Sequence, residues 1–306
     1  MTGRVGQLLI LISLCMSMSG CFTGIESTPR ISEKDVRRSN ITVTAEQQLG
    51  DSLIAPADFM SWQSGRMFLV TDQRIRLAVD AEKAPGVGDT LNYIGYRLIP
   101  SMMGDTLVTL LFDGPNNQAL SYSTGSTMNS LIERPRLTVP FTIDLTEVEL
   151  ANALLRGRKL YVITNQRVRN DGTDGEGRRF IPVTIIAVSP GDETSPLRVD
   201  FLTDDNATES VRMTVGNERR ATRNFHTLFS IENPRLKYPA IDDTTWENII
   251  NGRVTEGMTR EAARLAAGTP REVKKGQNGT SWYEQWTYDN GSYLIFEDGL
   301  LVRFRR

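Results

Sequence analysis

Residues 65–76 read Gly-Arg-Met-Phe-Leu-Val-Thr-Asp-Gln-Arg-Ile-Arg, and residues 157–169 read Gly-Arg-Lys-Leu-Tyr-Val-Ile-Thr-Asn-Gln-Arg-Val-Arg. The two stretches share a Gly-Arg start, an apolar centre and a Gln-Arg pair near the end. Short runs rich in β-branched and aromatic residues, bounded by turn-forming residues, are typical of β-strands. We therefore predict that the same strand-containing unit occurs twice in the chain.

Two further pairs of similar segments support a duplication. They are residues 120–125 with 211–216, and residues 132–137 with 231–236. The three pairs keep one order at nearly the same separation, as the copies of a repeated unit do. The sequence therefore predicts two β-rich repeat modules, residues 43–142 and 143–241.

Each module is predicted to open with a short helix and to continue as strands. The helical signals begin at Thr44 and Thr146, and the clearest strands are residues 107–112, 180–188 and 197–202. Many short strands with frequent turns, over about 90 residues, favour a small barrel or a rolled sheet. We expect an SH3-like barrel for each copy.

The last part of the chain, residues 242–306, has a different pattern. A capping box starting at Thr244 predicts one helix, and a second helix is expected from Thr259 to Gly268. The dipeptides Asn290-Gly291 and Asp298-Gly299 separate β-rich runs, and such dipeptides are strong hairpin signals. The predicted order is helix, helix and a three-stranded meander.

Several motifs in this region resemble the SmpA/OmlA (BamE-like) lipoprotein domain. They are residues 257–262, Gly268-Thr269-Pro270, residues 284–288 and residues 293–300. The resemblance implies an ααβββ fold, and the known members are small outer-membrane lipoproteins that act as binding accessories, notably in the assembly of outer-membrane β-barrels. The expected fold class is therefore α+β: two duplicated β-rich modules followed by a BamE-like ααβββ domain.

Residues 1–20 have the layout of a signal peptide. Arg4 precedes an apolar run from Leu8 to Leu14, which is far shorter than the ~20 residues of a membrane-spanning helix. The run is followed by a segment that resembles the lipobox of bacterial lipoproteins: Met18, Ser19, Gly20 and Cys21. The resemblance implies that Cys21 carries the lipid, and several acyl chains, at about 0.8 kcal/mol per buried methylene, make an anchor durable.

Residues 21–42 are polar and are predicted to be a lipidated tether. The expected location is the cell envelope, most simply the outer membrane with the protein facing the periplasm. The other cysteine, Cys15, would leave with the signal peptide, so the mature chain is expected to contain no disulfide.

The composition and the scarcity of reactive residues argue against several functions. The chain has 306 residues and a formal net charge of -2, whereas nucleic-acid-binding surfaces are strongly basic. His226 is the only histidine, in a stretch predicted to be a strand, and without histidine or cysteine partners it predicts no zinc site. The acidic loop at residues 171–176 lacks the spacing of a calcium loop. We predict no catalytic residues, no metal and no cofactor.

The aromatic residues of the final sheet are the candidate partner-binding residues: Trp282, Trp286, Tyr293 and Phe296. Their face forms either the core beneath the two helices or a patch for a partner. The leading hypothesis is a non-catalytic envelope lipoprotein that binds or scaffolds another envelope protein or a peptide. The alternative is a carbohydrate-active or hydrolytic enzyme that uses carboxylates, which a pocket with one raised carboxyl pKa would favour.

Overall fold

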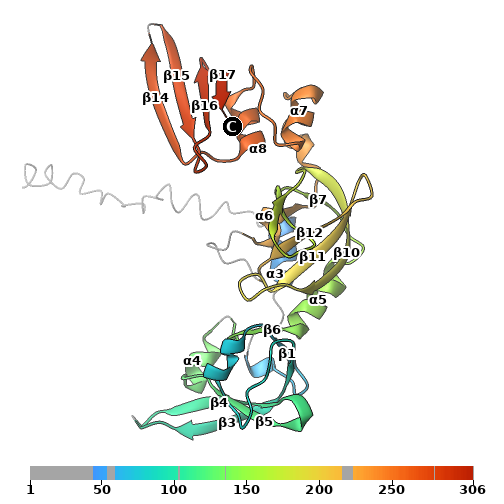
Figure 1. Ribbon diagram of the computed structural model, residues 1–306, viewed down its shortest axis with the longest axis vertical. Helices are drawn as coiled ribbons and strands as arrows, with labels where there is room; N and C mark the ends of the chain where they lie inside the picture. Colours follow the sequence, from blue (N-terminus) through green and yellow to red (C-terminus); the bar gives the residue numbers. More distant parts are fainter. Residues whose placement is uncertain are drawn as a thin grey trace, which may run out of the picture. The chain divides into compact units, whose positions relative to one another are not determined.

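The computed structural model describes residues 44–53, 59–102, 104–134, 136–215, 223–278 and 280–305 (Figure 1). The predicted signal peptide, lipobox and tether lie outside the described residues. Within them the chain is mostly β, with seventeen strands in four sheets and six α-helices. The predicted α+β class, with two SH3-like β-rich modules followed by an ααβββ domain, is therefore wrong.

The first sheet has six strands in the order β2-β5-β4-β3-β1-β6. In chain order these are β1 (Met67–Val70), β2 (Val79–Asp80), β3 (Thr90–Pro100), β4 (Thr106–Asp113), β5 (Ala119–Ser123) and β6 (Thr142–Asp144). Between them lie η1 (Phe59–Ser61), η2 (Gln73–Leu77), η3 (Pro115–Asn117) and α4 (Met128–Ile132). Its two edges remain separate, so the sheet is a half-barrel and not the SH3-like barrel that was expected.

The second sheet has five strands in the order β12-β11-β10-β7-β13. These are β7 (Lys159–Val162), β10 (Ile181–Pro190), β11 (Leu197–Thr203), β12 (Thr208–Met213) and β13 (Phe229–Ser230). The short strands β8 (Gln166–Val168) and β9 (Asp174–Glu176) pair with each other. Read from β5 to β6, the first sheet follows the same path as the second, and β3 and β10 each carry a bulge at the corresponding place.

The repeated Gly-Arg dipeptides occupy the same position in both sheets. Gly65 donates its backbone N–H to the carbonyl of Tyr93, and Gly157 donates to the carbonyl of Ile185. Both glycines have positive φ, at 95° and 79°, a conformation that glycine adopts without a steric penalty. The local turn before β1 and β7 therefore follows directly from the repeated sequence.

The helices are shared between the two sheets in a way that the repeat does not predict. Helix α5 (Leu145–Leu155) packs on β10, while α3 (Ala45–Ser52), which precedes the first sheet in the chain, places Leu49 and Leu53 in the core of the second sheet. The first sheet has its own core around Phe68, Leu91 and Phe112. The domain boundaries at residues 142 and 241 remain a prediction.

Each copy of the Pro-Arg motif joins its sheet to the next helix. Arg136 donates from Nε to Glu147 of α5 at 2.7 Å, and Arg235 of η4 (Pro234–Lys237) pairs with Asp243 at 3.1 Å. Asp243 is the first residue of α7 (Asp243–Ile250). The arginine of each repeat thus pairs with a carboxylate of the helix that follows, which is α5 for Arg136 and α7 for Arg235.

The terminal region contains two helices and a four-stranded sheet in the order β14-β15-β16-β17 (Figure 1). The elements are α7, α8 (Arg260–Ala267), β14 (Glu272–Asn278), β15 (Ser281–Thr287), β16 (Tyr293–Glu297) and β17 (Leu300–Arg305). The strand β14 was not expected, because its polar sequence lacks apolar alternation. The ααβββ domain implied by the resemblance to the BamE-like family is therefore not found.

Several local predictions can be compared with this region. The turns at Asn290-Gly291 and Asp298-Gly299 and the helix start at Thr259 are confirmed. The capping box at Thr244 is wrong, because Asp242 is the N-cap of α7 and accepts from the backbone N–H of Thr245. The side chain that caps the helix lies two residues earlier than the motif indicated.

Candidate functional site

The four candidate aromatic residues of the terminal sheet have different environments. Trp286 and Phe296 are each 1% exposed, and their ring centroids lie 4.6 Å apart in the core beneath α8. Tyr293 is half-buried, with its Cα opposite Arg305 on the neighbouring strand. Trp282 is 64% exposed. The sheet therefore brings Trp286 and Phe296 together as core and leaves Trp282 available to a partner.

Trp282 lines a cavity of about 440 Å³, which we call the Trp282 cleft. The cleft is bounded by Arg260 of α8, by strands β14 to β16 and by the β16–β17 turn, and its lining residues are Arg260, Lys275, Trp282, Tyr283, Glu284, Phe296, Asp298 and Gly299. The backbone of Trp282 is held to the β16–β17 turn, since the N–H of Trp282 donates to Oδ1 of Asp298 at 3.0 Å and the N–H of Asp298 donates to the carbonyl of Trp282 at 2.8 Å.

Glu284 is the electrostatic centre of the cleft. Its side chain is only 13% exposed, and it accepts hydrogen bonds from Trp286 Nε1 at 3.2 Å and from Arg260 Nη1 at 2.5 Å, with Lys275 Nζ at 3.4 Å. Burial acts to raise the pKa of Glu284, but these donors outweigh it and the pKa lies below its ordinary value. The carboxylate therefore stays charged and orients the two cations.

This arrangement is suited to binding. An exposed indole offers a flat apolar surface, and Arg260 and Lys275 place positive charge beside it. Tryptophan and arginine are the side chains most often responsible for binding energy at protein interfaces. A partner that places an apolar or aromatic group on Trp282 and a negative group near the two cations fits the cleft.

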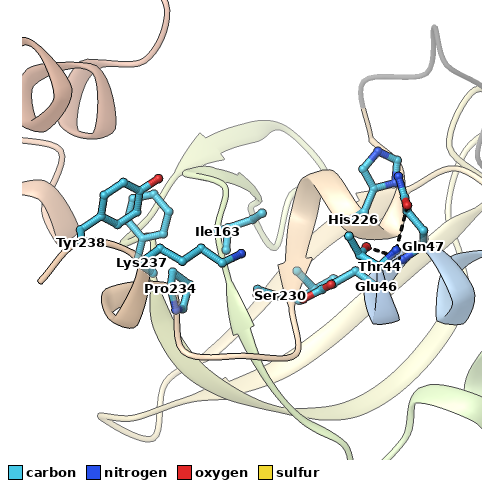
Figure 2. Close-up of a pocket in the computed structure, with 11 residues that line it drawn as sticks. Thr44, Glu46, Gln47, Ile163, His226, Ser230, Pro234, Lys237 and Tyr238 are labelled. Carbon is cyan, nitrogen blue, oxygen red and sulfur yellow. Dashed lines mark hydrogen bonds between the residues drawn. The ribbon is translucent and has the colours of Figure 1, made fainter. Parts of the chain in front are cut away.

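His226 lies in a separate cavity of about 320 Å³ with largely apolar walls (Figure 2). It belongs to the helical turn α6 (Phe225–Leu228), so the prediction of a strand at this histidine is wrong. Asn224 is the N-cap of this turn and has extended backbone angles, and the helical residues begin at Phe225. Figure 2 places His226 beside Gln47 and away from Lys237 and Tyr238.

Glu46 of α3 is the acidic residue of the His226 cavity. Its carboxylate accepts from Ser230 Oγ and from the backbone N–H of Ile231, each at 3.1 Å. Burial acts to raise the pKa of Glu46, yet hydrogen bonds to the backbone and to Ser230 lower it overall. The carboxylate thus attaches α3 to the second sheet and is not positioned to take up a proton near neutral pH.

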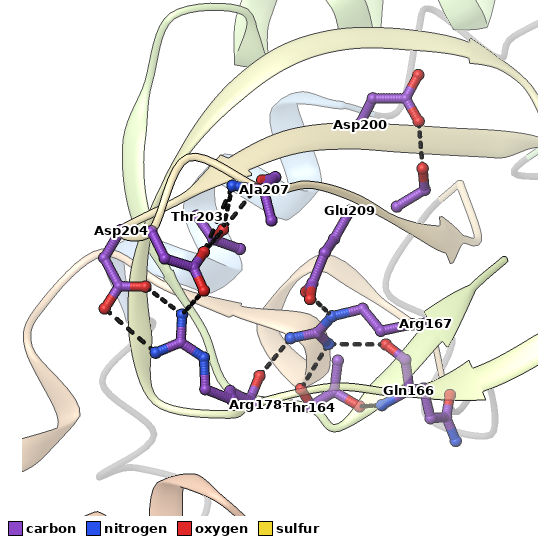
Figure 3. A network of polar contacts seen from close by, with 11 residues as sticks. Thr164, Gln166, Arg167, Arg178, Asp200, Thr203, Asp204, Ala207 and Glu209 are labelled. Carbon is purple, nitrogen blue, oxygen red and sulfur yellow. Dashed lines mark hydrogen bonds and ion pairs between the residues drawn. The ribbon is translucent and has the colours of Figure 1, made fainter. Parts of the chain in front are cut away.

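Arg167 forms a buried polar network beside the second sheet (Figure 3). It is 5% exposed, donates to the carbonyls of Thr164, Gln166 and Arg178, and pairs with Glu209 of β12. Burial lowers its pKa, and Glu209 partly offsets this effect. The guanidinium therefore ties β8 to β12, which is a structural task.

The acidic loop at residues 171–176 is occupied by contacts within the chain. Asp171 accepts from the backbone and hydroxyl of Thr173, and Asp174 pairs with Arg212 and Arg223. In the part of the chain that the structure describes, no group of three or more acidic, histidine or cysteine side chains is arranged to hold a metal ion.

Comparisons with known proteins add no relative: no family model and no curated protein matches the sequence. Among the described residues, no helix has the length and apolar character needed to cross a bilayer. The lipobox residues, including Cys21, lie outside the described residues.

Sequence reasoning singled out Trp282 but not its neighbours Lys275 and Glu284. Lys275 lies opposite Glu284 only because the unexpected strand β14 pairs with β15.

Proposed function

We propose that this protein is a lipid-anchored, non-catalytic binding accessory of the bacterial cell envelope. The attachment is assigned to Cys21, on the strength of the signal-like residues 1–20 and the lipobox Met18 to Cys21. The lipid would hold the protein at the outer membrane, facing the periplasm. A role in β-barrel assembly is not part of the proposal, because the domain fold that suggested it is not found.

The observation that carries the binding role is the exposed indole of Trp282 beside Arg260 and Lys275. The other three tryptophans, Trp62, Trp246 and Trp286, are each less than a tenth exposed. A large aromatic surface that the fold leaves uncovered, with fixed charges at its rim, is a typical anchor for a partner. The partner class that fits is another envelope protein or a peptide with an apolar and an acidic group.

The enzyme alternative would be favoured by a carboxyl group with a raised pKa. Every carboxyl group whose pKa departs from its ordinary value in the described segments has a lowered pKa. A general acid in a two-carboxylate mechanism needs a raised pKa.

The test is capture of partners from detergent-solubilised envelopes with the full lipidated protein and with Trp282→Ala. Ile186→Ala is the matched control, because Ile186 is also an exposed apolar residue (40%) but lies on the second sheet. We expect at least one envelope protein to be lost with Trp282→Ala and retained with Ile186→Ala. Identical sets from all three proteins would contradict the assignment of the Trp282 cleft.

A further inference from the structure

A polar cavity of about 350 Å³, which we call the Asn165 cavity, lies beside the second sheet. It is bounded by the hairpin of β8 and β9, by the C-terminal ends of α7 and α8, and by the turn between β15 and β16. None of the described residues that line it also lines the Trp282 cleft or the His226 cavity. Its volume is within the range of small-molecule sites, which is about 300–1,000 Å³.

Direct contacts hold the walls of the Asn165 cavity together. The backbone N–H of Arg179 donates to the carbonyl of Ile250 at the end of α7, at 3.1 Å, and Arg179 Nη1 donates to the carbonyl of Leu265 in α8, at 3.0 Å. Phe180 packs against Trp246 of α7, with ring centroids 5.5 Å apart. The segment before β10 is therefore tied to both helices at the wall of the cavity.

Asn165 contributes a carboxamide that the fold does not use. In the first repeat, Asp72 accepts from the backbone N–H two residues later at 2.8 Å. The second repeat is one residue longer here, and Thr164 takes this role, accepting from the N–H two residues later at 3.1 Å. The additional residue is Asn165, whose carbonyl is held by the N–H of Gly177 at 2.8 Å, while its side chain has no hydrogen-bond partner among the described residues.

The turn between β15 and β16 adds a second carboxamide. Asn290 accepts through Oδ1 from the backbone N–H of Ser292 at 3.0 Å and from its hydroxyl at 2.6 Å. The amide donors of Asn290 have no acceptor within the described segments. Ala267 and Leu294 also line the cavity, so hydrogen-bonding groups there are combined with a small apolar surface.

The charges around the cavity favour a neutral ligand. Of the described residues that line it, only Arg179 and Glu176 are charged, and their charges are opposite. The ends of α7 and α8 add the partial negative charge of helix C-termini, which disfavours an anion. A carboxamide both donates and accepts hydrogen bonds, so the lining matches a ligand with hydroxyl and amide groups.

We propose that the Asn165 cavity binds a neutral N-acetylated saccharide of the type found in cell-wall glycan. A sugar hydroxyl both donates and accepts, which suits the carboxamides of Asn165 and Asn290. An acetamido group adds an amide for the same side chains and a methyl group for Ala267 and Leu294. The saccharide class follows from the lining, whereas the cell wall as its source rests on the proposed envelope location.

Other occupants fit the lining less well. An apolar ligand would leave the carboxamides of Asn165 and Asn290 without hydrogen-bond partners. A metal ion would lack ligands, because the described residues contain no group of three acidic, histidine or cysteine side chains arranged to hold one. Water alone would also satisfy the polar groups, and the test below separates water from a saccharide.

The test is calorimetric titration of the full lipidated protein, in a detergent without a sugar headgroup, with triacetylchitotriose. Asn165→Leu should weaken binding about tenfold or more, because leucine keeps the size but removes both the donor and the acceptor. Asn170→Leu is the matched control, since Asn170 is an exposed residue of the same hairpin and does not line the cavity. The two variants should have similar urea unfolding midpoints, which separates lost binding from lost folding.

Two further measurements address the ligand class. Maltotriose, a neutral saccharide without acetamido groups, should bind about tenfold more weakly or not at all. Added salt should leave the affinity for triacetylchitotriose unchanged, because salt screens only charged groups.

Each other outcome overturns the proposal. Absence of binding would show that the cavity holds only water, and equal losses in Asn165→Leu and Asn170→Leu would place the saccharide elsewhere. Equal affinity for maltotriose would remove the role of the acetamido group, and weakening by salt would indicate a charged ligand. Because Trp282 does not line this cavity, these results are independent of the capture test with Trp282→Ala.

Discussion

Arg66 and Asp144 form a buried ion pair, with Arg66 Nε 2.7 Å from Asp144 Oδ2 and both side chains less than a tenth exposed. The other carboxylate oxygen of Asp144 accepts from the backbone N–H of Thr146 and so caps α5. The carboxylate of Asp144, at the end of β6, therefore binds Arg66 in the first sheet and also caps α5, the helix that packs on the second sheet.

Removal of Asp144 should be strongly destabilising. In Asp144→Ala the guanidinium of Arg66 stays buried without its anion, and α5 loses its cap, so we expect a loss of about 3–5 kcal/mol in the free energy of unfolding. Urea denaturation followed by circular dichroism measures it. Arg158→Ala is the control, because Arg158 is the exposed repeat counterpart of Arg66 and its loss should change stability by only about 0.5 kcal/mol. Similar losses in both variants would contradict this assignment.

The free energy of unfolding should likewise depend much more on Arg167 than on its repeat counterpart Arg74. Arg167→Ala leaves Glu209 and several carbonyls without their donor in a buried site, so we expect about 3–5 kcal/mol of destabilisation. Arg74 has a side chain that is 58% exposed and pairs with Asp72 at 2.8 Å, so its loss should lower the unfolding midpoint far less than the loss of Arg167. Urea unfolding of Arg167→Ala beside Arg74→Ala gives the comparison, and equal midpoints would show that burial does not separate the two arginines.

The stability of the terminal sheet should depend on pH through Glu284. Because its folded-state pKa lies below the ordinary value of 4.5, the carboxylate contributes stability above that pH, and the contribution is lost as pH falls through the folded pKa. We expect the wild type to lose more stability than Glu284→Gln between neutral pH and the acid range. Thermal unfolding across that range measures the difference, and parallel profiles would refute it.

Substitutions of Trp282 and Trp286 should change the stability of the fold to very different extents. Trp286→Ala removes a buried indole and should cost about 3–5 kcal/mol, whereas Trp282→Ala should change stability by no more than about 0.5 kcal/mol. Chemical denaturation gives both values. In acrylamide quenching, the readily quenched fraction of tryptophan fluorescence should disappear with Trp282→Ala, and its persistence would place another indole at the surface.

The sequence predicted local features well where a single dipeptide dictates geometry. Asn290-Gly291 and Asp298-Gly299 adopt the expected turns, because these residues tolerate the backbone conformations of tight hairpins. The missed strand β14 also had such a signal, the dipeptide Asn278-Gly279, but the polar residues before it concealed the strand. An edge strand needs little apolar alternation, which is why periodicity failed there.

Features that depend on distant contacts were not predictable. Trp282, Glu284 and Trp286 lie on the same face of β15, so the sequence pattern predicts the same burial for both tryptophans. Helix α8 has eight residues and is about 12 Å long, whereas the seven-residue strand β15 is about 23 Å long. Trp286 lies in one core with Ala262 and Ala266 of α8, whereas Trp282 stays exposed. Likewise, no local pattern places α3 in the core of the second sheet.

The most direct test of the envelope-lipoprotein account is the mass of the N-terminal peptide of the protein purified from its own membranes. We expect a peptide that starts at Cys21 and carries diacylglycerol on the thiol and an acyl chain on the amine, with membrane attachment lost in Cys21→Ala. A peptide that still contains residues 1–20, or an unmodified Cys21 in membrane-bound protein, would contradict the account.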